Sequence, residues 1–225
     1  MVFELFKGRS GDSQVDVIEG QIGEMLAKTH ETFVMAVDAL FRRVDPIEIG
    51  KPLRKADKTV NKVERSIRRS LVVHTGVRGA EADAPLLFTY MSISKDIERV
   101  GDLTKDMWDL AIAGVDMSAA PNRDDIDAHA SDIADLILDT AQVFAARDTE
   151  AATRFLNRAD AVKEQYEDLM LDQLSTDQPS SVAVGRALLY RYVNRIVAHL
   201  MNVMTAVVMP LDRLDYWDED KMDRE

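Results

Sequence analysis

Residues 53–67, LRKADKTVNKVERSI, carry apolar side chains at the spacing of an α-helix. Four of them recur every three or four positions and therefore share one helical face: Ala56, Val60, Val63 and Ile67. A second face, here called the basic face, holds Lys51, Arg54, Lys55, Lys58, Lys62, Arg65 and Arg69. Asp57, Asn61 and Glu64 run between the two faces. The stretch predicts a helix that buries one side and presents charged groups on the others.

The same pattern returns 103 residues further along the chain, where Asp57 aligns with Asp160 and Glu64 with Glu167. The order of matching residues is kept, since residues 55–57 (Lys-Ala-Asp) align with residues 158–160 (Arg-Ala-Asp). A shorter loop then reduces the offset to 96, which aligns Glu98 with Asn194. Many matches in one order indicate that the chain contains an internal duplication.

Helical periodicity extends over most of the chain, and alternating strand patterns are hard to find. We expect six helices, at about 13–43, 46–74, 84–113, 123–146, 149–175 and 179–212. Long helices joined by short connections favour antiparallel packing. The sequence therefore predicts an all-α fold of six long helices, arranged as two tandem three-helix bundles related by internal duplication.

These boundaries divide the chain into four parts: an N-terminal segment (1–12), a first repeat (13–115), a second repeat (122–212) and an acidic tail (213–225). Two Asp-x-Pro sequences, at Asp83 and Asp177, are typical helix starts. Asp45 followed by Glu48 resembles a capping box. In the tail, Tyr216 and Trp217 are candidates to fold back onto the bundle.

Composition excludes several classes of protein. There is no cysteine, which rules out disulfides, thiolate nucleophiles and iron–sulfur or zinc–thiolate sites. The formal net charge is −12, which argues against a general nucleic-acid binder. No signal peptide and no stretch able to span a bilayer is recognisable, so we expect a soluble, cytoplasmic protein.

Carboxylates at helical spacing are the first candidate site. Glu98 and Asp102 lie four residues apart, so one helix places them side by side, with Asp106 at their edge. All-oxygen ligands suit hard cations such as Mg²⁺, Ca²⁺, Mn²⁺ or iron. The alternative is a solvated surface in which Lys95 and Arg99 neutralise the two acids.

The basic face is the second candidate site, with Lys51, Lys55, Lys58, Lys62 and Arg65 as its partner-binding residues. The alternative is a solvated face, or one that pairs with an acidic neighbouring helix. No catalytic motif accompanies either site: there is no nucleophile elbow and no phosphate-binding glycine loop. No glutamate stands three residues before any of the four histidines. A di-iron carboxylate centre of the ferritin type needs such Glu-x-x-His pairs, so the sequence disfavours one. We therefore expect no enzyme.

Two motifs resemble the repeat of the PhoU family. They are residues 57–64, DKTVNKVE, and residues 93–102, ISKDIERVGD. The resemblance covers residues 15–210 and implies a tandem three-helix fold. It also implies a cytoplasmic, non-enzymatic regulator of phosphate transport and phosphate-starvation signalling. Such a regulator docks onto phosphate transporter components at the membrane, onto a sensor histidine kinase, or onto both, and a homodimer is a further candidate assembly.

The resemblance also implies a metal site. Members of the family hold iron, zinc or other cations through Glu/Asp-x-x-x-Asp motifs, which Glu98 and Asp102 match. The candidate ligands are Glu98, Asp102, Asp57, Glu64 and Asp106, and the candidate ions are iron, zinc, magnesium and manganese.

The second repeat departs from the family's motif. Asn194 and Ala198 replace its two acids, so we expect either one metal site, in the first repeat, or none. A second candidate site remains in this repeat, without the two acids that Asn194 and Ala198 replace. Its residues are Asp160, Glu164 and Glu167. The rival interpretation is a helical adaptor unrelated to phosphate that uses the basic face.

Overall fold

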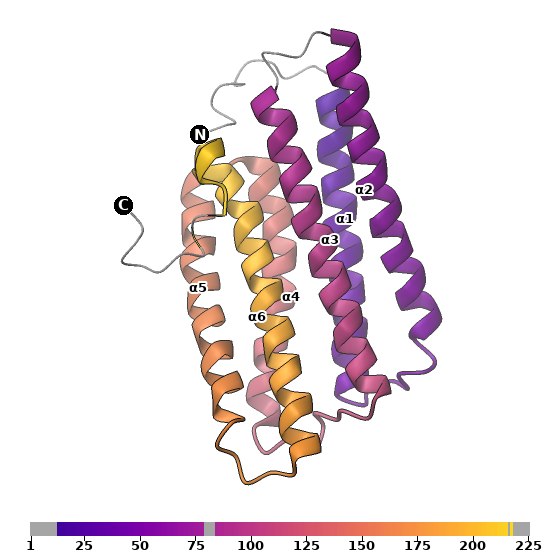
Figure 1. Cartoon of the computed structure of the whole chain (residues 1–225), viewed down its shortest axis with the longest axis vertical. Helices are drawn as coiled ribbons and strands as arrows, with labels where there is room; N and C mark the ends of the chain where they lie inside the picture. The colour runs from indigo at the N-terminus through magenta and orange to yellow at the C-terminus, as the bar shows by residue number, and fades with distance from the viewer. Residues whose placement is uncertain (1–12, 79–83, 216, 218–225) are drawn as a thin grey trace.

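The structure is a computed structural model that describes residues 13–78, 84–215 and 217. Every regular element in these ranges is helical, which confirms the all-α prediction (Figure 1). The helices are α1 (Ser13–Leu40), α2 (Gly50–Arg78), α3 (Ala84–Ile112), α4 (Arg123–Ala146), α5 (Thr149–Asp172), α6 (Ser180–Val208) and the short 3-10 helix η3 (Leu211–Arg213). The predicted N-terminal segment 1–12, the predicted cap Asp83, Tyr216 and residues 218–225 of the tail lie outside the described residues.

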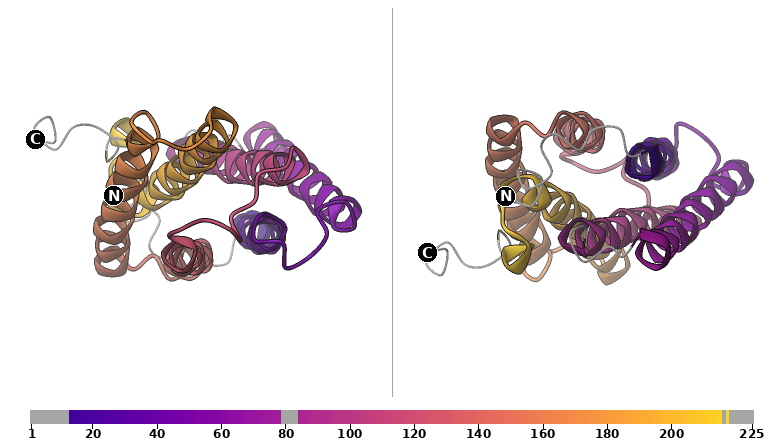
Figure 2. Two further views of the ribbon diagram at one scale, coloured as in Figure 1. Left: turned by 90° about the horizontal axis from the view of Figure 1, so that it is seen from below. Right: turned by 90° about the horizontal axis from the view of Figure 1, so that it is seen from above.

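Two three-helix units, α1–α2–α3 and α4–α5–α6, pack side by side (Figure 2). Helix α1 lies against α4, and α3 lies against α6, whereas α2 and α5 occupy opposite outer edges. The end of α1 meets the start of α4 through an ion pair of Arg43 with Asp127. The start of α1 meets the end of α4 through Glu19 and Arg147. The two helices are therefore antiparallel, as expected for units related by an approximate two-fold axis.

One continuous core joins the two units. Ile22 of α1, Tyr90 of α3, Ile137 of α4 and Leu200 of α6 are all fully buried and belong to the same cluster. Trp217, beyond α6, packs against this cluster as expected. The contact between the units is thus part of the core rather than a surface between separate domains.

Helix α2 begins at Gly50, later than the predicted start at residue 46. The Asp45 carboxylate accepts a hydrogen bond from the backbone N–H of Ile47 (2.8 Å) and so stabilises a turn ahead of the helix. The Trp108 indole N–H donates to the carbonyl of Pro46 (2.7 Å). A Cβ atom on Gly50 would lie 2.7 Å from the Trp108 ring. Packing of Trp108 therefore requires glycine here and sets where the regular helix starts.

Helix α1 ends at Leu40 rather than at the predicted residue 43. Arg42 follows in the left-handed region (φ 54°), and its guanidinium donates to the carbonyls of Ala111 (3.2 Å) and Val115 (3.1 Å). Val115 belongs to the linker between the units and packs against Gly185 of α6, where a Cβ would lie 2.7 Å from its side chain. The linker is therefore fixed at both α1 and α6.

The start of α5 is capped by Asp148, whose carboxylate accepts hydrogen bonds from the backbone N–H groups of Glu150 (3.0 Å) and Ala151 (2.9 Å). Helix α6 starts at the predicted place but not with the predicted cap. Its N-cap residue is Pro179, and no side chain caps it, so Asp177 does not fill that role.

Candidate functional site

Helix α2 has three distinct sides, as its sequence predicts. Leu53, Val60 and Ile67 are buried in the core. The side toward α3 carries Asp57 and Glu64, and the outer side carries the basic face. The two candidate sites therefore share α2, which lies at the outer edge of the molecule (Figure 1).

The structure brings three of the five predicted metal ligands into one neighbourhood between α2 and α3. Burial raises the pKa of the Asp57 carboxyl, and nearby Lys105 lowers it. The negative charges of Asp102 and Glu98 on α3 raise that pKa further. Asp57 therefore interacts electrostatically with Glu98 and Asp102 between the facing sides of α2 and α3.

Each of the acids on α3 already has a basic partner on its own helix. Lys95 Nζ lies 2.5 Å from the Glu98 carboxylate, and an Arg99 guanidinium nitrogen lies 3.1 Å from that of Asp102. Glu64, which is buried on α2, pairs with Arg68 at 2.6 Å. The neutralisation by Lys95 and Arg99 that the sequence left open is thus the arrangement observed.

Asp106 lies toward the other side of α3. Burial raises the pKa of its carboxyl, Lys105 lowers it, and Asp109 and Asp102 raise it. Asp106 also acts on Tyr192 of α6, whose pKa is raised by burial and by this charge. Within residues 13–78, 84–215 and 217, no three carboxylate or imidazole groups are gathered closely enough to hold a metal ion.

The second candidate site is spread over α5. Asp160 is buried, whereas Glu164 and Glu167 are exposed. Asn194, which replaces the family's glutamate on α6, donates a hydrogen bond to the backbone carbonyl of Lys163 (2.9 Å). The substituted residue thus joins α5 to α6 by a structural contact.

All seven residues of the basic face are exposed. They include the five predicted partner-binding residues: Lys51, Lys55, Lys58, Lys62 and Arg65. Among the described residues, none of the seven forms a salt bridge with a carboxylate, and Arg54 instead stacks on the ring of Trp108 (5.1 Å). This surface is therefore a row of positive charges without a salt-bridge partner, although Lys58 lowers the pKa of the neighbouring Asp57.

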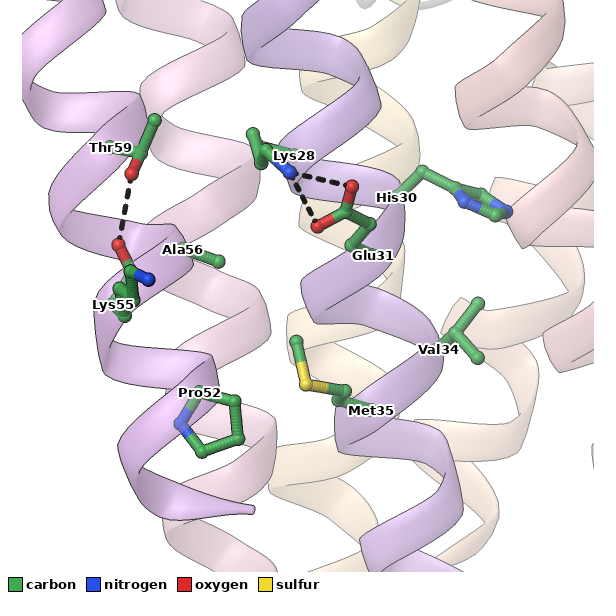
Figure 3. Close-up of a pocket in the computed structure, with 9 residues that line it drawn as sticks. All are labelled: Lys28, His30, Glu31, Val34, Met35, Pro52, Lys55, Ala56 and Thr59. Atoms are coloured by element: carbon green, nitrogen blue, oxygen red, sulfur yellow. Dashed lines mark hydrogen bonds and ion pairs between the residues drawn. The ribbon is translucent and has the colours of Figure 1, made fainter.

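An open groove between α1 and α2 flanks the basic face and encloses about 630 Å³ (Figure 3). Its lining is mixed and consists of Lys28, His30, Glu31, Val34, Met35, Pro52, Lys55, Ala56 and Thr59. Lys28 is already paired with Glu31 (2.7 Å). The groove did not follow from the sequence, because it depends on how far apart α1 and α2 pack.

A polar contact between α3 and α6 also escaped the sequence analysis. The Asp96 carboxylate accepts hydrogen bonds from His199 Nδ1 (2.9 Å) and from the Asn202 side-chain amide (3.1 Å). Asp96 is buried, and its two partners lie on the opposite unit. Asp96 belongs to the quoted motif, but nothing in the sequence pairs it with residues more than a hundred positions away.

Residues 22–111 match the family model of the PhoU domain. The first half of the chain is thus similar to the PhoU domain. The match extends from α1 to the end of α3 and includes Asp57, Glu98 and Asp102. It confirms the resemblance to the PhoU family that the two motifs indicated.

Two further comparisons extend the similarity to PhoU beyond the matched domain. The chain is 25% identical over 196 residues to a curated protein of Synechocystis sp., the phosphate-specific transport system accessory protein PhoU homolog, covering 84% of this chain and 86% of the relative. It also resembles the crystal structure of PhoU from Pseudomonas aeruginosa with a TM-score of 0.74 and 20% identity, covering 90% of this chain and 98% of that one. The second comparison establishes a shared fold. No described helix is sufficiently long and apolar to cross a membrane.

Proposed function

We propose that this protein is a non-enzymatic accessory regulator of phosphate transport. The observation that carries the proposal is the PhoU domain at residues 22–111. The curated relative that matches most of the chain is named as an accessory protein of a phosphate-specific transport system, which supports it further.

The regulator acts by docking in the cytoplasm onto a phosphate transporter component or its sensor histidine kinase. A double bundle with one continuous core is rigid, so it presents fixed helical faces to such a partner. The basic face on α2 is the surface whose charge is not already compensated within the described residues.

Deletion of the gene tests this proposal. In phosphate-rich medium we expect excess phosphate uptake and enlarged internal phosphate stores, both reversed by the intact gene. Unchanged uptake and stores would contradict the proposal. They would favour the rival interpretation, a helical adaptor unrelated to phosphate that binds through its basic face.

We further propose that the facing sides of α2 and α3 bind a cation: iron, zinc, magnesium or manganese. Glu98 and Asp102 are the principal ligands, and Asp57 is close enough to interact with both. Binding requires the cation to replace Lys95 and Arg99 as the partners of these acids. Asp160, Glu164 and Glu167 remain a second candidate group.

Metal content measured on the purified protein after equilibration with each ion tests this assignment. Changing Glu98 and Asp102 together to Ala should abolish binding and leave the helical content intact. The matched control changes Asp168 and Asp172 to Ala, an exposed pair with the same four-residue spacing that belongs to neither candidate group, and should leave binding unchanged. Undiminished metal in the first variant, or none in the unaltered protein, would rule out the site.

A further inference from the structure

The basic face of α2 is a straight row of cations. At 100° per residue, its seven residues and the exposed Val72 and Val73 all fall within about 60° of one line along the helix. From residue 51 to residue 69 the row is about 27 Å long. Asp57 and Glu64, the acids of the same stretch, point toward α3 instead. No negative charge of α2 therefore interrupts the row.

The fold does not require the C-terminal part of this row, as the duplicated helix shows. At the offset of 103, Lys51 and Lys55 correspond to Arg154 and Arg158 of α5, which pair with Glu150 and Asp139. The remaining positions of α5 are exposed but carry no positive charge, since Lys58, Lys62, Arg65 and Arg69 correspond to Ala161, Gln165, Asp168 and Asp172. The stability of the fold therefore does not account for these four cations of α2.

Elsewhere in the described residues, many cations are compensated. Lys28 pairs with Glu31, Arg43 with Asp127, and Arg154 with Glu150. The whole chain is strongly acidic, with a formal net charge of −12. An uncompensated basic row on such a molecule attracts a negatively charged surface and orients the remaining, acidic part away from it.

We propose that the basic face of α2 docks the protein onto an anionic lipid bilayer. The charged headgroups would bind the lysine and arginine side chains along the row. Val72 and Val73, which are 66% and 48% exposed, would contact the interface at one end of it. The inference deepens the proposed function, because a regulator of a membrane transporter works beside the bilayer.

The shape of this surface favours a bilayer over an acidic protein segment. Helix α2 lies at the outer edge of the molecule (Figure 2), and all seven residues of the row are exposed. The groove that could enclose a peptide lies to one side of the row, between α1 and α2, rather than along it. A flat surface can meet all seven cations at once.

Sedimentation with lipid vesicles tests the proposal on the full-length protein. We expect binding to vesicles of phosphatidylcholine containing about a third phosphatidylglycerol, weakening as salt is raised, and none to pure phosphatidylcholine. Each cation near such a surface strengthens binding roughly fivefold. The double variant Lys62→Glu/Arg65→Glu should therefore bind at least about twentyfold more weakly.

The matched control is Arg191→Glu/Arg195→Glu on α6, which changes two exposed arginines and alters the net charge by the same amount. It should bind almost as tightly as the unaltered protein, and circular dichroism should show both variants fully helical. Equal losses in the two variants would overturn the assignment to α2. Failure to bind the anionic vesicles would overturn the proposal, and binding to polyglutamate in their place would identify an acidic protein surface as the partner.

Vesicle binding and phosphate uptake are measured separately, so failure of one is distinguishable from failure of the other. A gene deletion without effect on uptake leaves the vesicle result unaltered. A protein that regulates uptake but ignores anionic vesicles retains the proposed function and loses only the inference about α2.

Discussion

Asp57 shows how a single residue sets the charge balance between the facing sides of α2 and α3. Its carboxyl is partly buried and lies near Glu98 and Asp102, so its ionised form is disfavoured, while Lys105 opposes this effect. Burial and like charges together leave the pKa of this carboxyl above its ordinary value. A bound cation would act in the opposite direction and lower the pKa of Asp57.

The variant Asp57→Asn tests this charge balance. The raised pKa means that the Asp57 carboxyl holds its proton more tightly in the folded state than in the unfolded chain. Ionised Asp57 therefore lowers the free energy of unfolding at neutral pH. This loss disappears as the pH falls through the raised pKa and the carboxyl takes up its proton. We expect the variant to be more stable than the original protein at neutral pH. The difference in free energy of unfolding between the two proteins should shrink as the pH falls toward the ordinary pKa of an aspartate side chain.

Urea unfolding of both proteins across this pH range provides the measurement. A stability difference that stays constant with pH would contradict the prediction. Repeating the neutral measurement with a saturating cation links this residue to the proposed metal site. With metal bound, Asp57→Asn should be less stable than the original protein, because the Asp57 carboxylate would then stabilise the metal-loaded fold.

At this scale, local pairs are predictable from sequence and distant pairs are not. Lys95 and Arg99 stand three residues before Glu98 and Asp102, a spacing that makes them neighbours on any helix. Asp96 and His199 meet only because α3 and α6 pack in one particular register. That register depends on the whole core, so no local pattern reveals the contact.

At the scale of helices, periodicity predicts the elements well because each helix buries one apolar face. The start of α2 is the exception. Asp45, Pro46 and Glu48 resemble a helix start, but regular helix waits until Gly50. The cause is Trp108, far away in the sequence, whose ring occupies the space that a side chain at position 50 would need.

Replacing Gly50 with Ala should therefore destabilise the protein, by about 1–3 kcal/mol, as expected for overpacking against a fixed ring. The control is Gly20→Ala on α1, where a Cβ meets no atom within 4 Å. That change should be neutral or stabilising by up to about 1 kcal/mol, because alanine favours helix. Thermal unfolding of both variants gives the comparison, and a harmless Gly50→Ala would refute the role assigned to Trp108.

For the whole molecule, the contacts between the two units decide how it unfolds. Asp96 is buried between them and accepts hydrogen bonds from His199 and Asn202. Asp96→Ala leaves two half-buried donors without this acceptor, which should cost about 1–2 kcal/mol. Asp109→Ala, at an exposed position of the same helix, should cost little.

Because the core is continuous, both variants should unfold in a single transition when followed by circular dichroism and by tryptophan fluorescence. Two separate transitions would show that the units are independent domains. If Asp96→Ala and Asp109→Ala lower the free energy of unfolding equally, the hydrogen bonds of Asp96 between α3 and α6 contribute no stability of their own.

The approximate two-fold arrangement of the two three-helix units allows their surface charges to differ. Helix α1 meets α4, and α3 meets α6, as equivalent surfaces meet in a symmetric homodimer. In a homodimer, one gene encodes both subunits, so every surface charge appears twice. Joining the copies in one chain removed that constraint, and α2 carries Lys58, Lys62, Arg65 and Arg69 where α5 carries neutral and acidic residues. The duplication thus gave the molecule one edge with an excess of positive charge, and with it a single direction in which to face a negatively charged partner.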